Sequence, residues 1–207
     1  MPLKFVRPCV PTTAKSIPRG DAWLHEPKLD GYRLQIVKDG ALLRLYSRSG
    51  YDWTKRLALL ADALAAIRCK SVVIDCELAF PTAQGTPDFR ALQAAVGNRW
   101  RHHELAVFAF DLLHHDGADL RSSPLIERRL QLTKLVARTK VHCLHLVQGF
   151  DDGAKLYKAA AQHGLEGVVS KRMAAPYRSG LSRDWVKVKT DAWRAANRER
   201  WRLFEKR

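Results

Sequence analysis

A lysine between two carboxylates is the residue of this chain best suited to covalent chemistry. It lies in the segment EPKLDGYR (residues 26–33), where Lys28 follows Glu26 and precedes Asp30. A lysine amine attacks electrophiles once it is deprotonated. Because the pKa of a free lysine is about 10.4, reactivity near neutral pH requires burial or neighbouring cations that lower this pKa. Taken alone, the segment fits a charged turn before a strand equally well.

Carboxylates inside apolar segments form the second group of interest. In the stretch 71–80, three aliphatic residues precede Asp75, and Glu77 follows two positions later. Side chains alternate along a strand, so these two carboxylates should share a face. An interior carboxylate is costly unless it meets a cation or a metal. A further acid, Asp111, lies inside the apolar stretch 105–113, and we interpret it as a structural residue.

Basic residues supply the third group. The segment WVKVK (residues 185–189) alternates, so Lys187 and Lys189 should share a face. Arg48 lies in a small polar turn, SRSG (residues 47–50). Read singly, such lysines are usually a solvated strand edge and such an arginine ordinary surface. Two histidine pairs, at 102–103 and 114–115, are predicted to lie in solvated loops rather than to bind a metal.

The surrounding pattern predicts an α+β fold with mainly antiparallel sheets flanked by helices. Four prolines indicate an extended arm over residues 1–22, and Asp39-Gly40 is typical of a hairpin turn. Residues 174–183 are predicted to form a polar loop. The predicted strands cover residues 22–27, 32–37, 41–47, 71–80, 105–113, 141–147, 165–171 and 185–189, and the predicted helices cover 55–67, 88–96, 124–137, 151–163 and 191–207.

Composition limits the class of protein and its partners. The formal net charge of +15 indicates an anionic partner, most often nucleic acid. No apolar run reaches the roughly 18 residues of a membrane helix, and the start of the chain does not resemble a signal peptide. The four cysteines are scattered without a CxxC pair, which argues against a disulfide framework or a zinc site and predicts a reducing cytoplasm.

Six segments together resemble the nucleotidyltransferase domain of ATP-dependent DNA ligases, and especially the ligase modules of bacterial end-joining systems. Each segment is a modest signal, but all six occur in the family's order with sensible gaps. One departure is Ser49, where the family commonly has asparagine. The six segments are EPKLDGYR (26–33), SRSG (47–50), DCEL (75–78), FAFDLL (108–113), EGVVSK (166–171) and WVKVK (185–189).

The resemblance implies that Lys28 attacks the α-phosphate of ATP and carries AMP through a phosphoramidate bond. It implies Mg2+, with Mn2+ as an alternative, as the metal cofactor. The other implied roles are adenine contact through the backbone of Glu26, adenine stacking on Phe110, phosphate or ribose-phosphate contact by Arg33 and Arg48, ribose or metal contact by Glu77, metal contact by Glu166, and neutralisation of phosphate charge by Lys187 and Lys189.

For the fold, the resemblance implies an ATP-grasp-like nucleotidyltransferase domain over residues 1–190, with a basic helix over 191–207. Too few residues follow Lys189 for an oligonucleotide-binding (OB-fold) barrel, so none is expected in this chain. The implied partner is nicked double-stranded DNA, with a repair protein that supplies DNA clamping. A monomer in the bacterial cytoplasm, associated with the nucleoid and not with a membrane, is expected.

Other functions remain open on the sequence. One is an RNA ligase or a capping-type nucleotidyltransferase. Another is a non-catalytic protein that binds nicks or DNA ends. A third is an accessory subunit that needs a partner domain to close around DNA.

Overall fold

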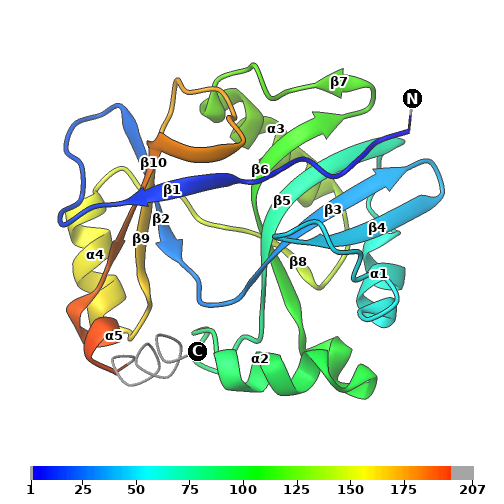
Figure 1. Cartoon of the computed structure of the whole chain (residues 1–207), viewed down its shortest axis with the longest axis horizontal. Coiled ribbons are helices and arrows are strands. Elements are labelled where there is room, and N and C mark those ends of the chain that lie inside the picture. The colour runs from blue at the N-terminus through cyan, green and yellow to red at the C-terminus, as the bar shows by residue number, and fades with distance from the viewer. Residues whose placement is uncertain (1, 197–207) are drawn as a thin grey trace.

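A four-stranded sheet, sheet A, carries the lysine segment at one edge. The computed structural model describes residues 2–196. The strand order in sheet A is β1-β10-β9-β2 (Figure 1). The β1 strand runs parallel to β10, and the other neighbours are antiparallel. The strands are β1 (Cys9–Thr13), β2 (Trp23–Lys28), β9 (Gly167–Arg172) and β10 (Gly180–Lys189).

A larger sheet, sheet B, has the order β4-β3-β5-β6-β7, and β8 joins it by parallel pairing with β6. Its central pairs are antiparallel, as the alternating sequence pattern predicts. Its strands are β3 (Tyr32–Asp39), β4 (Leu42–Ser47), β5 (Ser71–Ala79), β6 (Ala106–His115), β7 (Ala118–Asp119) and β8 (Leu144–Leu146).

Helices flank the two sheets on their outer sides. In Figure 1, α4 lies beside sheet A, α1 lies beside sheet B at the opposite side of the molecule, and α2 lies below both. The helices are α1 (Ala58–Leu64), α2 (Phe89–Val96), the 3-10 helix η1 (Arg99–Glu104), α3 (Leu125–Arg138), α4 (Gly153–Gln162) and α5 (Asp191–Ala196).

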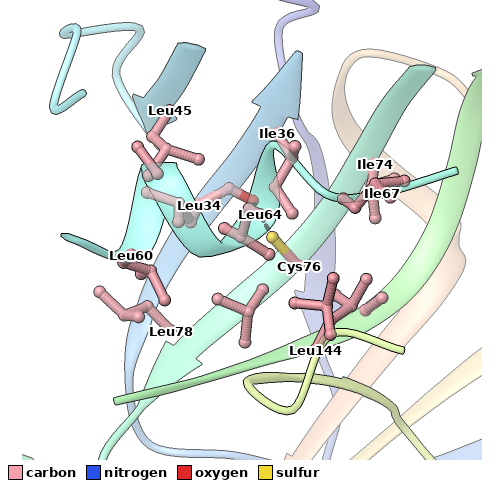
Figure 2. Close-up of a cluster of buried hydrophobic side chains, with 14 of the residues drawn as sticks. Leu34, Ile36, Leu45, Leu60, Leu64, Ile67, Ile74, Cys76, Leu78 and Leu144 are labelled. Carbon is pink, nitrogen blue, oxygen red and sulfur yellow. Dashed lines mark hydrogen bonds between the residues drawn. The ribbon is translucent and has the colours of Figure 1, made fainter. Parts of the chain in front are cut away.

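The alternation of side chains in sheet B decides what each face contacts. Ile74, Cys76 and Leu78 of β5 point into the main core, together with leucines of α1 (Figure 2). On the opposite face, Val73 packs in a second cluster with Trp185 of sheet A. Asp75 and Glu77 share the spacing of Val73, so they face the space between the two sheets. The predicted common face of the two carboxylates therefore lies between the sheets.

Several segments differ from the sequence-based expectations. The extended arm contains the strand β1, and the predicted polar loop ends early because Gly180 already begins β10. His102 is not solvated, because it lies on η1 with 3% of its surface exposed, and His114 lies within β6. The predicted helix over 191–207 is observed as α5, and its remainder lies outside the described residues. Within residues 2–196, no helix is long and apolar enough to cross a membrane.

A fully buried ion pair joins sheet B to α3. The Arg128 guanidinium donates two hydrogen bonds of 2.8 Å to the two carboxylate oxygens of Asp111. Its remaining nitrogen donates to the carbonyl oxygens of Ser123 and Ala175. Both side chains of the pair have 0% exposure. Asp111 is therefore the structural acid that the sequence predicts. Its negative charge, which would be costly if buried alone, is paired with Arg128.

We expect Arg128→Ala to lower the free energy of unfolding by about 3–5 kcal/mol, because it leaves the Asp111 carboxylate buried and unpaired. Urea unfolding followed by circular dichroism measures the loss. The matched control is Arg121→Ala, since Arg121 makes a similar two-pronged contact with Asp119 on the exposed surface. The control should lose less than about 1 kcal/mol. Equal losses in the two variants would contradict the assignment.

Candidate active site

A pocket of about 500 Å3 lies where sheet A meets sheet B. This volume lies within the roughly 300–1,000 Å3 that is usual for small-molecule sites. Most residues that the sequence marks as candidates line it. The lining includes Glu26, Lys28, Arg33, Arg48, Glu77, Phe110, Glu166 and Lys187.

Strand register places two lysines around one carboxylate. Lys28 at the end of β2 and Lys189 at the end of β10 are both paired with Gly167, the first residue of β9 between them. Glu166 precedes this glycine and is 5% exposed. Its Oε2 lies 2.7 Å from Nζ of Lys28, and its Oε1 lies 2.9 Å from Nζ of Lys189. The carboxylate therefore fixes the lysine amine at the pocket.

A close backbone approach explains the glycine three positions after Lys28. A Cβ atom on Gly31 would lie 2.3 Å from the carbonyl oxygen of Leu78 and 3.0 Å from Cγ of Glu77. No larger residue fits there, so Gly31 lets the lysine loop lie directly against β5. Glu77 of β5 lines the pocket beside this loop. Burial raises the pKa of Glu77 to about 7, nearby Lys28 and Arg33 oppose the rise, and Glu166 adds to it.

A β-bulge turns Phe110 toward the inner end of the pocket. Asp75 pairs with Asp111 and the next residue, Cys76, pairs with Ala109, so Phe110 is the extra residue on β6. Bulges commonly re-aim side chains beside active sites. The Phe110 ring meets the Trp185 ring at a centroid distance of 6.0 Å and an interplanar angle of 75°. The pocket therefore has an aromatic wall made of two rings, Phe110 from sheet B and Trp185 from sheet A.

A buried cation lies behind this wall. Nζ of Lys171 is 4.3 Å from the Phe110 ring centroid and 4.2 Å from the Trp185 ring centroid. It also lies 2.5 Å from Oε2 of Glu26. Burial lowers the pKa of Lys171, and the Glu26 carboxylate opposes that effect. The other oxygen of Glu26 is buried without a hydrogen bond, 3.4 Å from a guanidinium nitrogen of Arg129.

Arg33 lines the pocket, but its guanidinium is already bound. It donates two hydrogen bonds to Asp75, at 2.9 and 2.6 Å, and one to the carbonyl oxygen of Cys9. Tyr177 donates a further hydrogen bond of 2.6 Å to Asp75. Burial disfavours the charged form of Arg33, but the charge and hydrogen bonds of Asp75, together with Tyr177 and Glu77, outweigh it, and the pKa of Arg33 is raised. The pair ties the N-terminal arm to sheet B.

Two further cations stand at the mouth of the pocket. Burial lowers the pKa of Lys187, and repulsion from Lys28, Lys189 and Arg48 lowers it further. Across residues 2–196, the structure gives neither Lys187 nor Arg48 a carboxylate within ion-pair distance. The mouth therefore carries positive charge that an anionic ligand would neutralise.

The arrangement brings together every predicted site residue around one pocket, with Lys189 reached through Glu166. Sequence reasoning missed Lys171, Trp185 and Arg129. Lys171 and Trp185 were inside segments already marked by the family likeness, which was the available signal. Nothing in the sequence distinguished Arg129 from the other basic residues of α3. A lysine amine, an aromatic wall and unpaired cations together suit attack on a phosphate of a bound nucleotide.

Comparison with known proteins identifies the family. A family described as "ATP dependent DNA ligase domain" matches residues 8–189. The chain is 38% identical over 187 residues to the "Multifunctional non-homologous end joining protein LigD" of Pseudomonas aeruginosa, covering 90% of this chain and 22% of that protein. It is 33% identical over 197 residues to a "Probable DNA ligase" of Rhodococcus jostii, covering 90% of this chain and 38% of that protein.

Solved structures agree with this assignment. The ligase domain of LigD from M. tuberculosis superposes with a TM-score of 0.75 at 33% identity, covering 88% of this chain and 60% of that chain. A mycobacterial DNA ligase D complexed with ATP and MES gives a TM-score of 0.71, also at 33% identity, over 88% of this chain and 59% of that one. The chain thus spans well under half of the curated relatives it matches. From the matched residues and the shared fold, this chain belongs to the family of ATP-dependent DNA ligase domains.

Proposed function

We propose that this chain is an ATP-dependent adenylyltransferase that forms a lysyl-AMP intermediate and seals nicks between a 5′-phosphate and a 3′-hydroxyl in duplex DNA during repair. The observation that carries the proposal is the contact of 2.7 Å between Nζ of Lys28 and Glu166 inside a pocket rimmed by further cations. It holds the amine where the phosphates of a nucleotide would lie. The catalytic unit would be residues 1–190.

Lys28 is the proposed nucleophile. Its amine, after losing a proton, forms a bond from nitrogen to the α-phosphorus of ATP. The bond from that phosphorus to the bridging oxygen breaks, and pyrophosphate leaves with the electron pair. Lys187 and Lys189 would neutralise the charge that develops on the leaving group, which is the main demand of phosphoryl transfer. The adenylate would then pass to the 5′-phosphate of DNA, and the 3′-hydroxyl would displace AMP.

The inner end of the pocket is the proposed adenosine site. Adenine would stack on Phe110, and the backbone of Glu26 would contact its edge, since the Glu26 side chain is engaged by Lys171. The Glu77 carboxylate would accept a hydrogen bond from the ribose. Arg48 would bind a phosphate at the mouth. Phosphate binding by Arg33 would require its guanidinium to leave Asp75, so the contacts favour a positioning role for it.

Magnesium is the proposed metal cofactor, with manganese as an alternative. No group of three His, Cys, Asp or Glu in the described residues could enclose a metal alone. Mg2+ usually needs only one or two carboxylates, with water and substrate phosphates completing its shell. Glu166 and Glu77 fit this requirement, because they lie close enough for Glu166 to raise the pKa of Glu77. When bound, the metal would offset negative charge on the phosphates.

The proposed partner is nicked double-stranded DNA, in agreement with the net charge of +15. A repair protein that clamps the DNA is a further proposed partner. We propose a monomer that acts in the bacterial cytoplasm at the nucleoid.

Nick-sealing assays with RNA strands in place of DNA separate this function from an RNA ligase or capping-type enzyme. Retention of nicked DNA without any AMP adduct would indicate a non-catalytic end binder, and sealing only after addition of a barrel-bearing protein would indicate an accessory subunit.

We expect Lys28→Ala to abolish the covalent AMP adduct, because it removes the proposed attacking nitrogen, the one amine of the pocket that lies 2.7 Å from Glu166. Incubation with labelled ATP and Mg2+, followed by mass spectrometry of the peptide around residue 28, measures the adduct. Lys158→Ala, at an exposed lysine of α4, is the matched control and should keep full labelling. Wild-type protein that stays at its unmodified mass would overturn the proposal.

We expect Glu166→Gln to slow adduct formation by about 10- to 100-fold, a loss typical when a residue that holds a reacting group or metal is removed. The substitution keeps the shape of the side chain but removes the charge shared by Lys28 and Lys189. Rates are measured across a Mg2+ titration. The control is Glu127→Gln at an exposed position of α3, and an unchanged rate in Glu166→Gln would exclude the assigned role.

We expect Phe110→Leu to raise the apparent KM for ATP about fivefold, because leucine fills the space but offers no ring face to adenine. The control is Phe108→Leu on the same strand, whose ring packs against His145 outside the pocket. Adduct formation at graded ATP concentrations measures both. Equal effects of the two substitutions would indicate a loss of packing in β6 rather than a loss of stacking.

A further inference from the structure

Tyr51 is an exposed aromatic residue at the mouth of the pocket. It lines the hollow, yet 72% of its surface is exposed to solvent. The aromatic wall inside is different, because Trp185 is only 3% exposed. When a ligand covers a large aromatic side chain that was exposed to solvent, the burial of its apolar surface stabilises the complex. Because Tyr51 is so much more exposed than Trp185, it lies on the solvent side of the pocket, where it can contact a ligand that extends out of the pocket.

The turn that carries Tyr51 is well braced. The Ser47 amide donates to the Tyr51 carbonyl oxygen at 2.9 Å, and the Tyr51 amide donates to Oγ of Ser47 at 3.1 Å. Gly50 has a φ of +84°, which few other residues adopt, and its position lies against the Phe5 ring. Because the turn is fixed by these contacts, binding through Tyr51 would cost little ordering of the backbone.

The charge around Tyr51 specifies the kind of ligand. Arg48 extends from the same turn, and it lies close enough to Lys187 to lower the pKa of that lysine, after the larger effect of burial. An exposed ring among cations is the combination that proteins use to hold nucleic acid: the cations meet phosphates and the ring packs on a base or sugar. Neither a lipid surface nor an acidic peptide requires the aromatic face.

We propose that Tyr51 is a positioning residue for the DNA end, packing its ring against the terminal nucleoside at the nick while Arg48 holds the neighbouring phosphate. This inference rests on the proposed function, and it assigns Tyr51 to DNA rather than to ATP. The adenosine site lies at the buried aromatic wall, and Tyr51 stands at the solvent side of the same pocket. Tyr51 therefore contributes to DNA binding and contributes little to the reaction of Lys28 with ATP.

The experiment compares Tyr51→Ala, Tyr51→Phe and Leu42→Ala in the full chain. Leu42 is a matched exposed residue, 53% exposed, at the opposite end of β4 from the turn. Fluorescence anisotropy with a nicked duplex measures DNA affinity, and labelled ATP measures the AMP adduct. We expect Tyr51→Ala to weaken DNA binding about tenfold, as for loss of one stacked base. Tyr51→Phe should stay within about twofold of wild type, because the ring carries the contact.

The two activities separate the inference from the function on which it rests. Tyr51→Ala should lose far less adduct formation than DNA affinity, and Leu42→Ala should change neither. Wild-type affinity in Tyr51→Ala, or a parallel loss of adduct formation, would overturn the inference alone. A Tyr51→Phe variant as weak as Tyr51→Ala would overturn the role of the ring. Wild-type protein that forms the adduct but neither binds nor seals nicked DNA would overturn the proposed function as well.

Discussion

The site depends on the register of three strands in sheet A. Lys28 and Lys189 both pair with Gly167, so Glu166 at the start of β9 reaches both amines. In a sheet, a slip of one residue sends every side chain to the opposite face. Such a slip of β2 or β10 relative to β9 would turn Lys28 or Lys189 away from Glu166. Backbone pairing therefore brings both lysines to Glu166, whose carboxylate then holds the amine of the proposed nucleophile.

A buried network of charges between the sheets holds the strand β1. Arg33 bonds to Asp75 and to the backbone of Cys9, and Tyr177 bonds to the same Asp75. Buried ion pairs add little net stability, because removing charges from water is costly. Their geometry is strict, however, and an unpaired partner is heavily penalised. This network ties β1, the parallel neighbour of β10, to sheet B.

Much of the fold and of the site could be predicted from the sequence, because the alternation of side chains along strands and the order of the motifs determine them. Alternation in β5 correctly placed Asp75 and Glu77 on one face, and the order of motifs identified the family. What could not be predicted depends on contacts far apart in the chain. Residues 180–182 read as a polar loop because they form a strand by pairing with β1, which is far away in the sequence. The bulge at Phe110 and the burial of His102 likewise arise from tertiary packing.

The pocket divides into two electrostatic regions, and this division explains why a nucleotide suits it. At the inner end, the Lys171 cation is balanced by Glu26 and covered by the rings of Phe110 and Trp185. At the mouth, Lys187 and Arg48 lack carboxylate partners among residues 2–196, and their mutual repulsion lowers the pKa of Lys187 further after the effect of burial. A ligand with a flat neutral end and an anionic end complements both regions. A uniformly charged or uniformly apolar ligand would leave one region unsatisfied.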